Sequence, residues 1–269
     1  MKEAMNLTAV AEAVNRLAAF LGMRDISALT PSALKERYGI SRADVAVLFG
    51  GSILAGGDLL AEAMRNGVAD RYVIVGGAGH TTDTLRERMR EHLRQSVPEG
   101  GSEAELFAAY LSELHGLKPD LLECRSTNCG NNITYLLSLL RSEGIPCRSI
   151  LLIQDASMQR RMDAGLRREA SDVLPINYAA YAVTVRAEGD RLVLDGNPKG
   201  MWTLPRYLSL LLGEIPRLRD DENGYGPVGR GFIAHVDIPR EIEEAFTLLS
   251  QYAGESTRFA DPRFASVKQ

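Results

Sequence analysis

Between residues 43 and 177, short apolar runs alternate with segments of helical periodicity, and this pattern constrains the fold more than any other feature of the chain. The runs are rich in β-branched residues, as strands are when a parallel sheet is covered on both faces. Successive parallel strands also need crossover connections, which the helical segments supply. We therefore predict an α/β fold, a Rossmann-like parallel sheet of about five strands flanked by helices. Its strands are expected at residues 43–49, 72–75, 121–123, 149–153 and 172–177.

The segments on either side of this pattern are expected to cover the sheet. Apolar residues recur at helical spacing from Val10 to Leu21, and Thr30-Pro31 is typical of a helix start. Beyond residue 200 the chain becomes helical and very apolar, and its last helix carries Ile242. The expected parts are an N-terminal helical segment packed on the core (1–40), a Rossmann-like core (41–200) and a small, mainly helical C-terminal cover (201–269).

Two local motifs can be placed within the core. Apolar residues from Ile133 to Leu140 follow helical spacing, with Ser126 or Thr127 as the expected N-cap. Alternating apolar residues on both sides of Gly189 predict a small hairpin, which we expect at the edge of the sheet.

Composition and charge exclude several classes of protein. The chain has 31 Lys and Arg against 35 Asp and Glu, a net charge of −4, so a nucleic-acid partner is not expected. The longest apolar stretches are far shorter than the roughly 20 residues that cross a bilayer, so no membrane span is expected. Three cysteines without paired spacing indicate neither a disulfide framework nor a structural metal site, and they favour the cytoplasm.

Polar loops follow four of the predicted strands. In an open parallel sheet, ligands bind outside the carboxyl ends of the strands, where loop amides and helix N-termini converge. These loops begin at Gly50, Gly76, Glu123 and Gln154. We therefore expect one polar small-molecule site at this edge of the sheet.

The loop GGAGHTT, residues 76–82, can offer backbone amides to an anion. It is equally consistent with a tight turn from strand to helix in which Thr81 or Thr82 is the N-cap. His80 is a candidate acid or base, and the alternative for it is a structural histidine.

The loops after the third and fourth strands carry further candidates. The run STNCGNN holds more short polar side chains than a helix cap needs, so it favours ligand contact. Glu123 and Asp155 can each be a structural carboxylate or a hydrogen-bond acceptor for a ligand. Arg160 and Arg161 fall in the first turn of a helix, where the dipole disfavours cations, so at least one is expected to face an anion at the site. The run RLRDD, residues 217–221, is expected to be a salt-bridged surface turn.

Several motifs together resemble the SanA/ElyC/YdcF family of bacterial α/β proteins. They are GGAGHTT, STNCGNN, QDASMQRR and the long segment RYLSLLLGEIPRLRDDENGYGPVGRGFIAHVDIP, which occur in this order. The resemblance implies a Rossmann-like core with a smaller C-terminal part, and binding of S-adenosylmethionine. By position, the implied ligand-binding residues are Gly50, Gly77, Gly79, His80, Thr81, Glu123, Ser126, Asn128, Asn132, Gln154, Asp155 and Arg160.

The sequence departs from the family pattern at two positions. Asn131 replaces a glutamate that the family commonly has, which weakens any catalytic or metal-binding role of that position. Gly51 stands where the YdcF branch has asparagine. His80 and Asp155 are the candidate catalytic residues, and no metal ligand is expected.

Three functions remain open from the sequence. The first is a protein that binds a nucleotide-like ligand, S-adenosylmethionine foremost, with methyl transfer as an open activity. The second predicted strand ends in Gly76-Gly77 rather than in an acidic residue, so binding is better supported than methyl transfer. The alternatives are a hydrolase or transferase of a phosphorylated metabolite, with Arg160 on the anion and His80 as acid or base, and a non-catalytic sensor.

Overall fold

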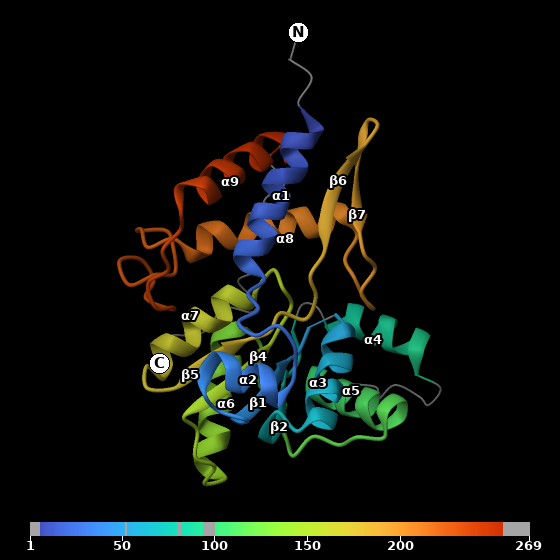
Figure 1. Cartoon of the computed structure of the whole chain (residues 1–269), viewed down its shortest axis with the longest axis vertical. Coiled ribbons are helices and arrows are strands. Elements are labelled where there is room, and N and C mark those ends of the chain that lie inside the picture. Colours follow the sequence, from blue (N-terminus) through green and yellow to red (C-terminus); the bar gives the residue numbers. More distant parts are fainter. Residues whose placement is uncertain (1–5, 52, 80–81, 94–99, 255–269) are drawn as a thin grey trace.

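The structure, a computed structural model, describes residues 6–51, 53–79, 82–93 and 100–254. It confirms the α/β class, with helices packed around a central sheet (Figure 1). This sheet has five parallel strands in the order β3-β2-β1-β4-β5. The strands are β1 (Ala43–Phe49), β2 (Ala69–Val75), β3 (Leu121–Glu123), β4 (Ser149–Ile153) and β5 (Leu174–Asn177). β2 begins three residues earlier than expected from the sequence, and β5 begins two residues later.

Helices cover both faces of the sheet because alternate strand residues point to opposite sides. Val45, Val47 and Phe49 pack with residues of α6 (Cys129–Ser142) and α7 (Gln159–Glu169). Ala46 and Leu48 belong to a second apolar cluster on the other face. That cluster includes residues of α3 (Ala55–Asn66), α4 (Thr82–His92) and α5 (Glu103–Tyr110). A π-helical turn, Leu111–His115, continues α5.

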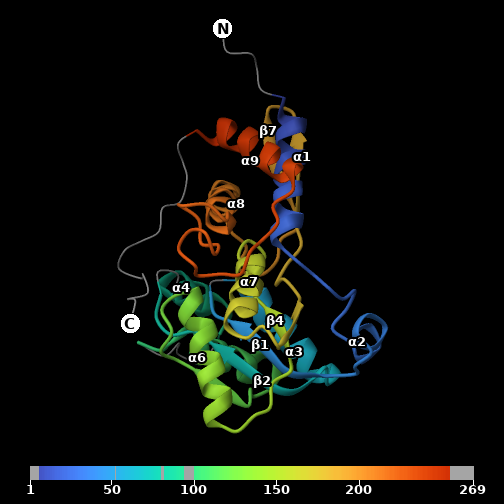
Figure 2. The same cartoon turned by 90° about the vertical axis from the view of Figure 1, so that its left-hand side faces the viewer.

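Both ends of the described chain contribute to a second layer, here called the cover. It consists of α1 (Leu7–Leu21), the hairpin β6 (Thr184–Glu188) and β7 (Arg191–Asp195), α8 (Leu204–Leu218) and α9 (Arg240–Ala253). α1 packs against α9, α8 and β6, and Figures 1 and 2 both show α1 beside α9 and the hairpin, away from the sheet. The N-terminal helix therefore packs with the C-terminal helices.

The segment between α1 and β1 lies beside the sheet. It contains α2 (Pro31–Tyr38), which starts as the sequence predicts, because Thr30 Oγ1 accepts a hydrogen bond from the Ala33 N–H and Pro31 follows it. Asp25 exchanges backbone and side-chain hydrogen bonds with Asn177 at the end of β5. Arg24 forms an isolated antiparallel bridge with Tyr178.

The hairpin is correctly predicted, but its expected place at the edge of the sheet is wrong. β6 and β7 form a separate two-stranded sheet. The outer edge at the end of β5 already pairs with Arg24 and Asp25, whereas the hairpin binds α1. There the Asn15 side chain donates to Val185 O at 2.8 Å and accepts from Val185 N–H at 2.7 Å, in the manner of a neighbouring strand.

The expected N-cap of α6 is also wrong. The cap is Asn128, whose side chain accepts a hydrogen bond from the Asn131 N–H. Ser126 cannot do this because its hydroxyl accepts a hydrogen bond from the Gly77 N–H instead. Among the described helices, none combines the length and the apolar character that a bilayer span requires.

Candidate functional site

The order of the strands reverses between β1 and β4, which makes this pair the topological switch point of the sheet. From β1 the chain proceeds through β2 to β3 on one side, and it then returns to add β4 and β5 on the other. Ligands of doubly wound sheets bind at the carboxyl ends of the strands at this point. The residues that follow β1 and β4, Gly50-Gly51 and Gln154, are therefore the first to consider.

Close contacts join the loops at this edge into one surface. The Gly77 N–H, after β2, donates to Ser126 O, after β3, at 3.0 Å. A Cβ on Gly50 would lie 3.3 Å from the Gly76 Cα, and one on Gly51 would lie 4.0 Å from Gln154 Oε1. The described residues that follow four successive strands thus lie next to one another, as the sequence predicts.

Glycine is required at three of these positions for steric reasons. A Cβ on Gly50 would lie 2.5 Å from Glu103 Oε2, and one on Gly77 would lie 2.3 Å from Ser126 O. Gly51 has a φ of 148°, which side chains disfavour. Gly77 is therefore explained by the close approach of two loops, without reference to a ligand.

Three of the described amides of the loop after β2 do not support its expected anion-binding role. The Gly76 N–H donates to Glu123 O at 2.9 Å, and the Gly77 N–H donates to Ser126 O. The Gly79 N–H donates to Thr82 Oγ1 at 2.7 Å. These three donors face the protein, so none is open to a phosphate. His80 and Thr81 lie outside the described residues.

The predicted ligand-contacting residues after β3 hold their own loop. The Glu123 carboxylate accepts hydrogen bonds from the N–H groups of Arg125, at 2.8 Å, and Ser126, at 3.2 Å. Ser126 and Glu123 are both buried, Asn128 is the N-cap of α6, and Asn132 lies buried in its first turn. For Glu123, the geometry favours the structural alternative over contact with a ligand hydroxyl.

Gln154 is the predicted site residue that the structure best supports. It follows β4 directly and is 1% exposed, and its Oε1 accepts a hydrogen bond of 2.7 Å from the Asp155 N–H. Its Nε2 is buried and has no hydrogen-bond partner among the described residues. A buried donor without a partner costs about 1–3 kcal/mol, so an acceptor brought to this atom by a ligand would gain that interaction.

Asp155, a predicted catalytic residue, is surrounded by donors from the protein. Its Oδ1 accepts from the Ser157 N–H, the Ser157 hydroxyl and the Tyr181 hydroxyl, and its Oδ2 accepts from Trp202 Nε1. Burial and this carboxylate raise the pKa of Tyr181 well above its usual value. Four hydrogen bonds to the protein favour an anchoring role, in which Asp155 ties the cover to the sheet.

Arg160 does not point toward the loops after β1 and β2, in contrast to the expectation from the helix dipole. Its Nε donates to Phe20 O at 2.5 Å, and its guanidinium lies 4.0 Å from the centre of the Phe20 ring. Phe20 is in the last turn of α1, where unsatisfied carbonyl groups attract a cation. The carbonyl end of α1, rather than an anionic ligand, therefore compensates the positive charge of Arg160.

Arg161, the second arginine of this turn, forms a buried ion pair. Its Nε lies 2.5 Å from Glu214 Oε2 on α8, and the two side chains are 13% and 1% exposed. The ion pair connects α7 to the cover.

Glu103 is a candidate that the sequence interpretation missed. It is the first residue of α5 and is 7% exposed, and its Oε1 accepts a hydrogen bond of 2.9 Å from Thr82 Oγ1. Its other carboxylate oxygen lies against Gly50 and Gly76 at the ends of β1 and β2. A search of the residues that follow strands could not find it, since it arrives from a helix start whose only signal is the capping box of Ser102 and Glu105.

Two of the three cysteines lie in surroundings that disfavour a thiolate nucleophile. Burial raises the pKa of Cys124, and it raises the pKa of Cys147 to about 12. Among the residues that the structure describes, no group of three or more His, Cys, Asp or Glu side chains is placed to hold a metal ion.

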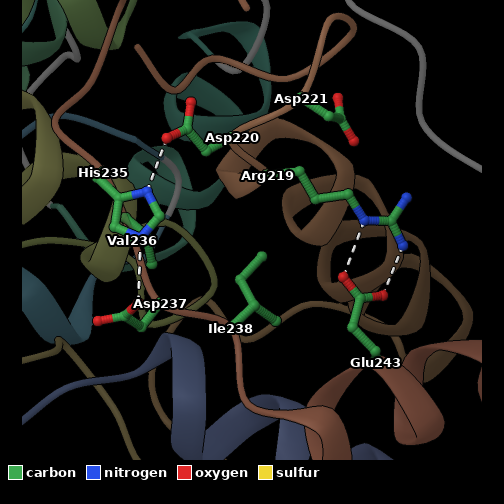
Figure 3. Close-up of a pocket in the computed structure, with 8 residues that line it drawn as sticks. All are labelled: Arg219, Asp220, Asp221, His235, Val236, Asp237, Ile238 and Glu243. Carbon is green, nitrogen blue, oxygen red and sulfur yellow. Dashed lines mark hydrogen bonds and ion pairs between the residues drawn. The ribbon is translucent and has the colours of Figure 1, made fainter. Parts of the chain in front are cut away.

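A separate pocket of about 620 Å³ lies on the cover and is open to solvent (Figure 3). Arg219 forms two hydrogen bonds with Glu243, and His235 lies between Asp220 and Asp237. The Asp221 carboxylate accepts from the N–H groups of the turn that follows it. These contacts confirm the predicted salt bridges for Arg219 and Asp220, whereas residues 217 and 218 of the predicted turn belong to α8, and Leu218 is buried. No protein-family model matches the chain.

Proposed function

We propose that this chain is a member of the SanA/ElyC/YdcF family and binds a nucleotide-like small molecule, S-adenosylmethionine foremost, at the carboxyl ends of β1 and β4. The observation that carries the proposal is the buried Gln154 Nε2 without a partner among the described residues, on a side chain whose Oε1 lies near Gly51 at the switch point. A residue that binds a ligand at this point of a doubly wound sheet is expected to have a polar atom that lacks a hydrogen-bond partner within the protein.

The polar groups at this edge fit a ligand that carries both donors and acceptors. Gln154 Nε2 offers a donor, and the Glu103 carboxylate, which lies against Gly50 and Gly76, offers acceptors. S-adenosylmethionine presents hydroxyl and ammonium donors together with carboxylate and ring-nitrogen acceptors. The Gln154 donor and the Glu103 acceptors therefore complement groups of S-adenosylmethionine, and no additional charged side chain is needed.

The same contacts make a phosphorylated metabolite a poorer fit. The N–H groups of Gly76, Gly77 and Gly79 are bound to the protein, and a carboxylate lies against Gly50 and Gly76. Arg160, which was to hold the anion, is bound to Phe20. A phosphate here would meet a negative charge without these expected partners. We therefore prefer the nucleoside type of ligand, either for an enzyme or for a sensor.

Calorimetry on metal-free protein tests the proposal, with S-adenosylmethionine and S-adenosylhomocysteine as ligands and inorganic phosphate for comparison. Gln154→Glu keeps the acceptor for the Asp155 N–H but removes the open donor. We expect roughly tenfold weaker binding, since a lost hydrogen bond of about 1.5 kcal/mol corresponds to one decade in affinity. Gln251→Glu, at an exposed position of α9, is the matched control.

The outcomes separate the alternatives. The proposal is supported if wild type and Gln251→Glu bind an adenosyl ligand equally well and Gln154→Glu binds it more weakly. The absence of heat and of a thermal shift at millimolar adenosyl ligand would exclude S-adenosylmethionine. Binding of phosphate alone would favour the phosphorylated metabolite.

A further inference from the structure

Glu103 is held firmly at the end of the second strand. The capping box of Ser102 and Glu105 starts α5 at this residue. The N–H groups of Glu103 and Ala104 donate to Gly77 O and Gly76 O at 2.9 and 2.8 Å. The start of α5 is therefore fixed on the loop that follows β2.

The carboxylate occupies the space that a side chain after β2 would fill. A Cβ on Gly76 would lie 3.0 Å from the Glu103 Cβ and 3.4 Å from its Oε2. The glycines at positions 50 and 76 leave this space open. A side chain of α5 thus supplies the acid that the sequence lacks directly after β2.

This position has a defined role in doubly wound sheets. Where such a sheet binds a dinucleotide, an acidic residue that follows the second strand accepts hydrogen bonds from the ribose hydroxyls. A carboxylate only accepts, and its two oxygens can bind two neighbouring hydroxyls. Gln154, whose side chain lies near Gly51, then has its Nε2 available for an acceptor elsewhere on the same ligand.

We propose that Glu103 accepts hydrogen bonds from the adjacent hydroxyls of a ribose, so that this chain selects ribonucleosides against deoxyribonucleosides and against phosphate. The inference rests on the proposed function, because it concerns the same edge of the sheet. It adds the group of the ligand that is recognised and the residue that recognises it.

The test compares S-adenosylhomocysteine with its 2′-deoxy and 3′-deoxy analogues by calorimetry on the full chain. We expect each deoxy analogue to bind wild type at least tenfold more weakly than the parent compound. In Glu103→Gln this preference should fall below threefold. Glu62→Gln, which changes an exposed carboxylate of α3 outside this capping box, should keep the wild-type preference.

A second variant covers the case in which Glu103→Gln does not fold. Glu103→Asp keeps the negative charge at the start of α5 but shortens the side chain by one methylene, so it draws the carboxylate back from Gly50 and Gly76 and should also reduce the preference for ribose. Equal binding of parent and deoxy analogues by wild type would overturn the role of Glu103 and leave the proposed function standing. Absence of binding by every adenosyl compound would overturn both.

Discussion

Trp202 Nε1 donates a hydrogen bond of 2.7 Å to Asp155 Oδ2, and this bond joins the segment that leads into α8 to the end of β4. Arg88 of α4 lies over the same indole, with its guanidinium carbon 4.8 Å from the ring centre. The only tryptophan of the chain therefore contacts one group from a loop of the sheet and one from α4. Its fluorescence reports on the junction between the sheet and the cover.

Asp155→Asn should destabilise this junction. The amide nitrogen of asparagine must face either Trp202 Nε1 or the donors of Ser157 and Tyr181, so one donor is left opposite another. We expect a loss of about 1–3 kcal/mol in the free energy of unfolding. Thermal unfolding followed by Trp202 emission measures it, with the exposed Asp195→Asn as control. An unchanged melting temperature together with lost ligand binding would instead place Asp155 in contact with the ligand.

Removing one partner of the buried pair Arg161–Glu214 should be strongly destabilising. Glu214→Gln leaves the Arg161 guanidinium without its charge partner at a site where both side chains are buried. We expect a loss of about 3–5 kcal/mol. Replacing both residues by apolar ones, as in Arg161→Met with Glu214→Leu, should recover only part of it, because Arg217 Nη1, 3.9 Å from Glu214 Oε1, also loses this carboxylate. The exposed pair Arg240–Glu244 on α9 is the control, and Glu244→Gln should cost less than about 0.5 kcal/mol. Urea unfolding of the four proteins would refute this expectation if Glu214→Gln matched Glu244→Gln.

His235, in the pocket on the cover, should make the stability of the folded protein depend on pH. Its Nδ1 lies 2.7 Å from Asp220 and its Nε2 lies 3.0 Å from Asp237, and only an imidazolium can donate to both carboxylates. These hydrogen bonds raise the pKa of His235 above its ordinary value of 6.5. Because the pKa of His235 is higher in the folded than in the unfolded chain, its protonation stabilises the folded state. This stabilisation is complete at a pH below the pKa of the unfolded chain, and it is lost as the pH rises through the pKa of the folded chain.

The difference in stability between wild type and His235→Gln should therefore be present at about pH 5.5 and should disappear at about pH 9. Asp220, whose pKa is lowered from 3.8 mainly by the Val228 N–H, titrates below this window and does not contribute to the change. An NMR titration of the His235 ring gives the pKa directly. In Asp237→Asn this pKa should move back toward 6.5. A titration that is the same in both proteins would contradict the bridging role.

The sheet could be predicted from the sequence because its signal is local. The β-branched run of β1 and the helical spacing from Ile133 to Leu140 each identify an element without reference to the rest of the chain. Because parallel strands run in the same direction, the loops that follow them lie at one edge of the sheet. Gly50 and Gln154 lie at this edge, as the sequence predicts.

The contacts within the site could not be predicted because they join residues that are distant in the sequence. Glu103 reaches the end of β2 from a helix start, and the capping box at Ser102 conceals its role. The family resemblance implies ligand contacts for Ser126 and Glu123, and the residues themselves leave a structural role for Glu123 open. In the structure their polar atoms bind the backbone of their own and a neighbouring loop. Short polar side chains after a strand serve either purpose, and sequence alone does not distinguish a loop that is completed by a ligand from one that is completed by another loop.

Arg160 illustrates the same difficulty and leads to the last prediction. The dipole of α7 does require a negative partner for a first-turn arginine, but the partner is Phe20 O at the end of α1, 140 residues away in the sequence.

A hydrogen bond from a charged donor contributes about 1.5–3 kcal/mol, and a cation above an aromatic ring adds about 0.5–1 kcal/mol at exposed sites. Because Arg160 is only partly buried, we expect Arg160→Met to lose about 1–2 kcal/mol of stability, near the lower end of these ranges. Its affinity for an adenosyl ligand should stay within twofold of wild type. Arg168→Met, in the last turn of α7, is the control and should change neither quantity. If Arg160→Met instead keeps the melting temperature and loses affinity tenfold or more, the guanidinium leaves Phe20 to bind the ligand, and the site extends beyond Gln154 along α7.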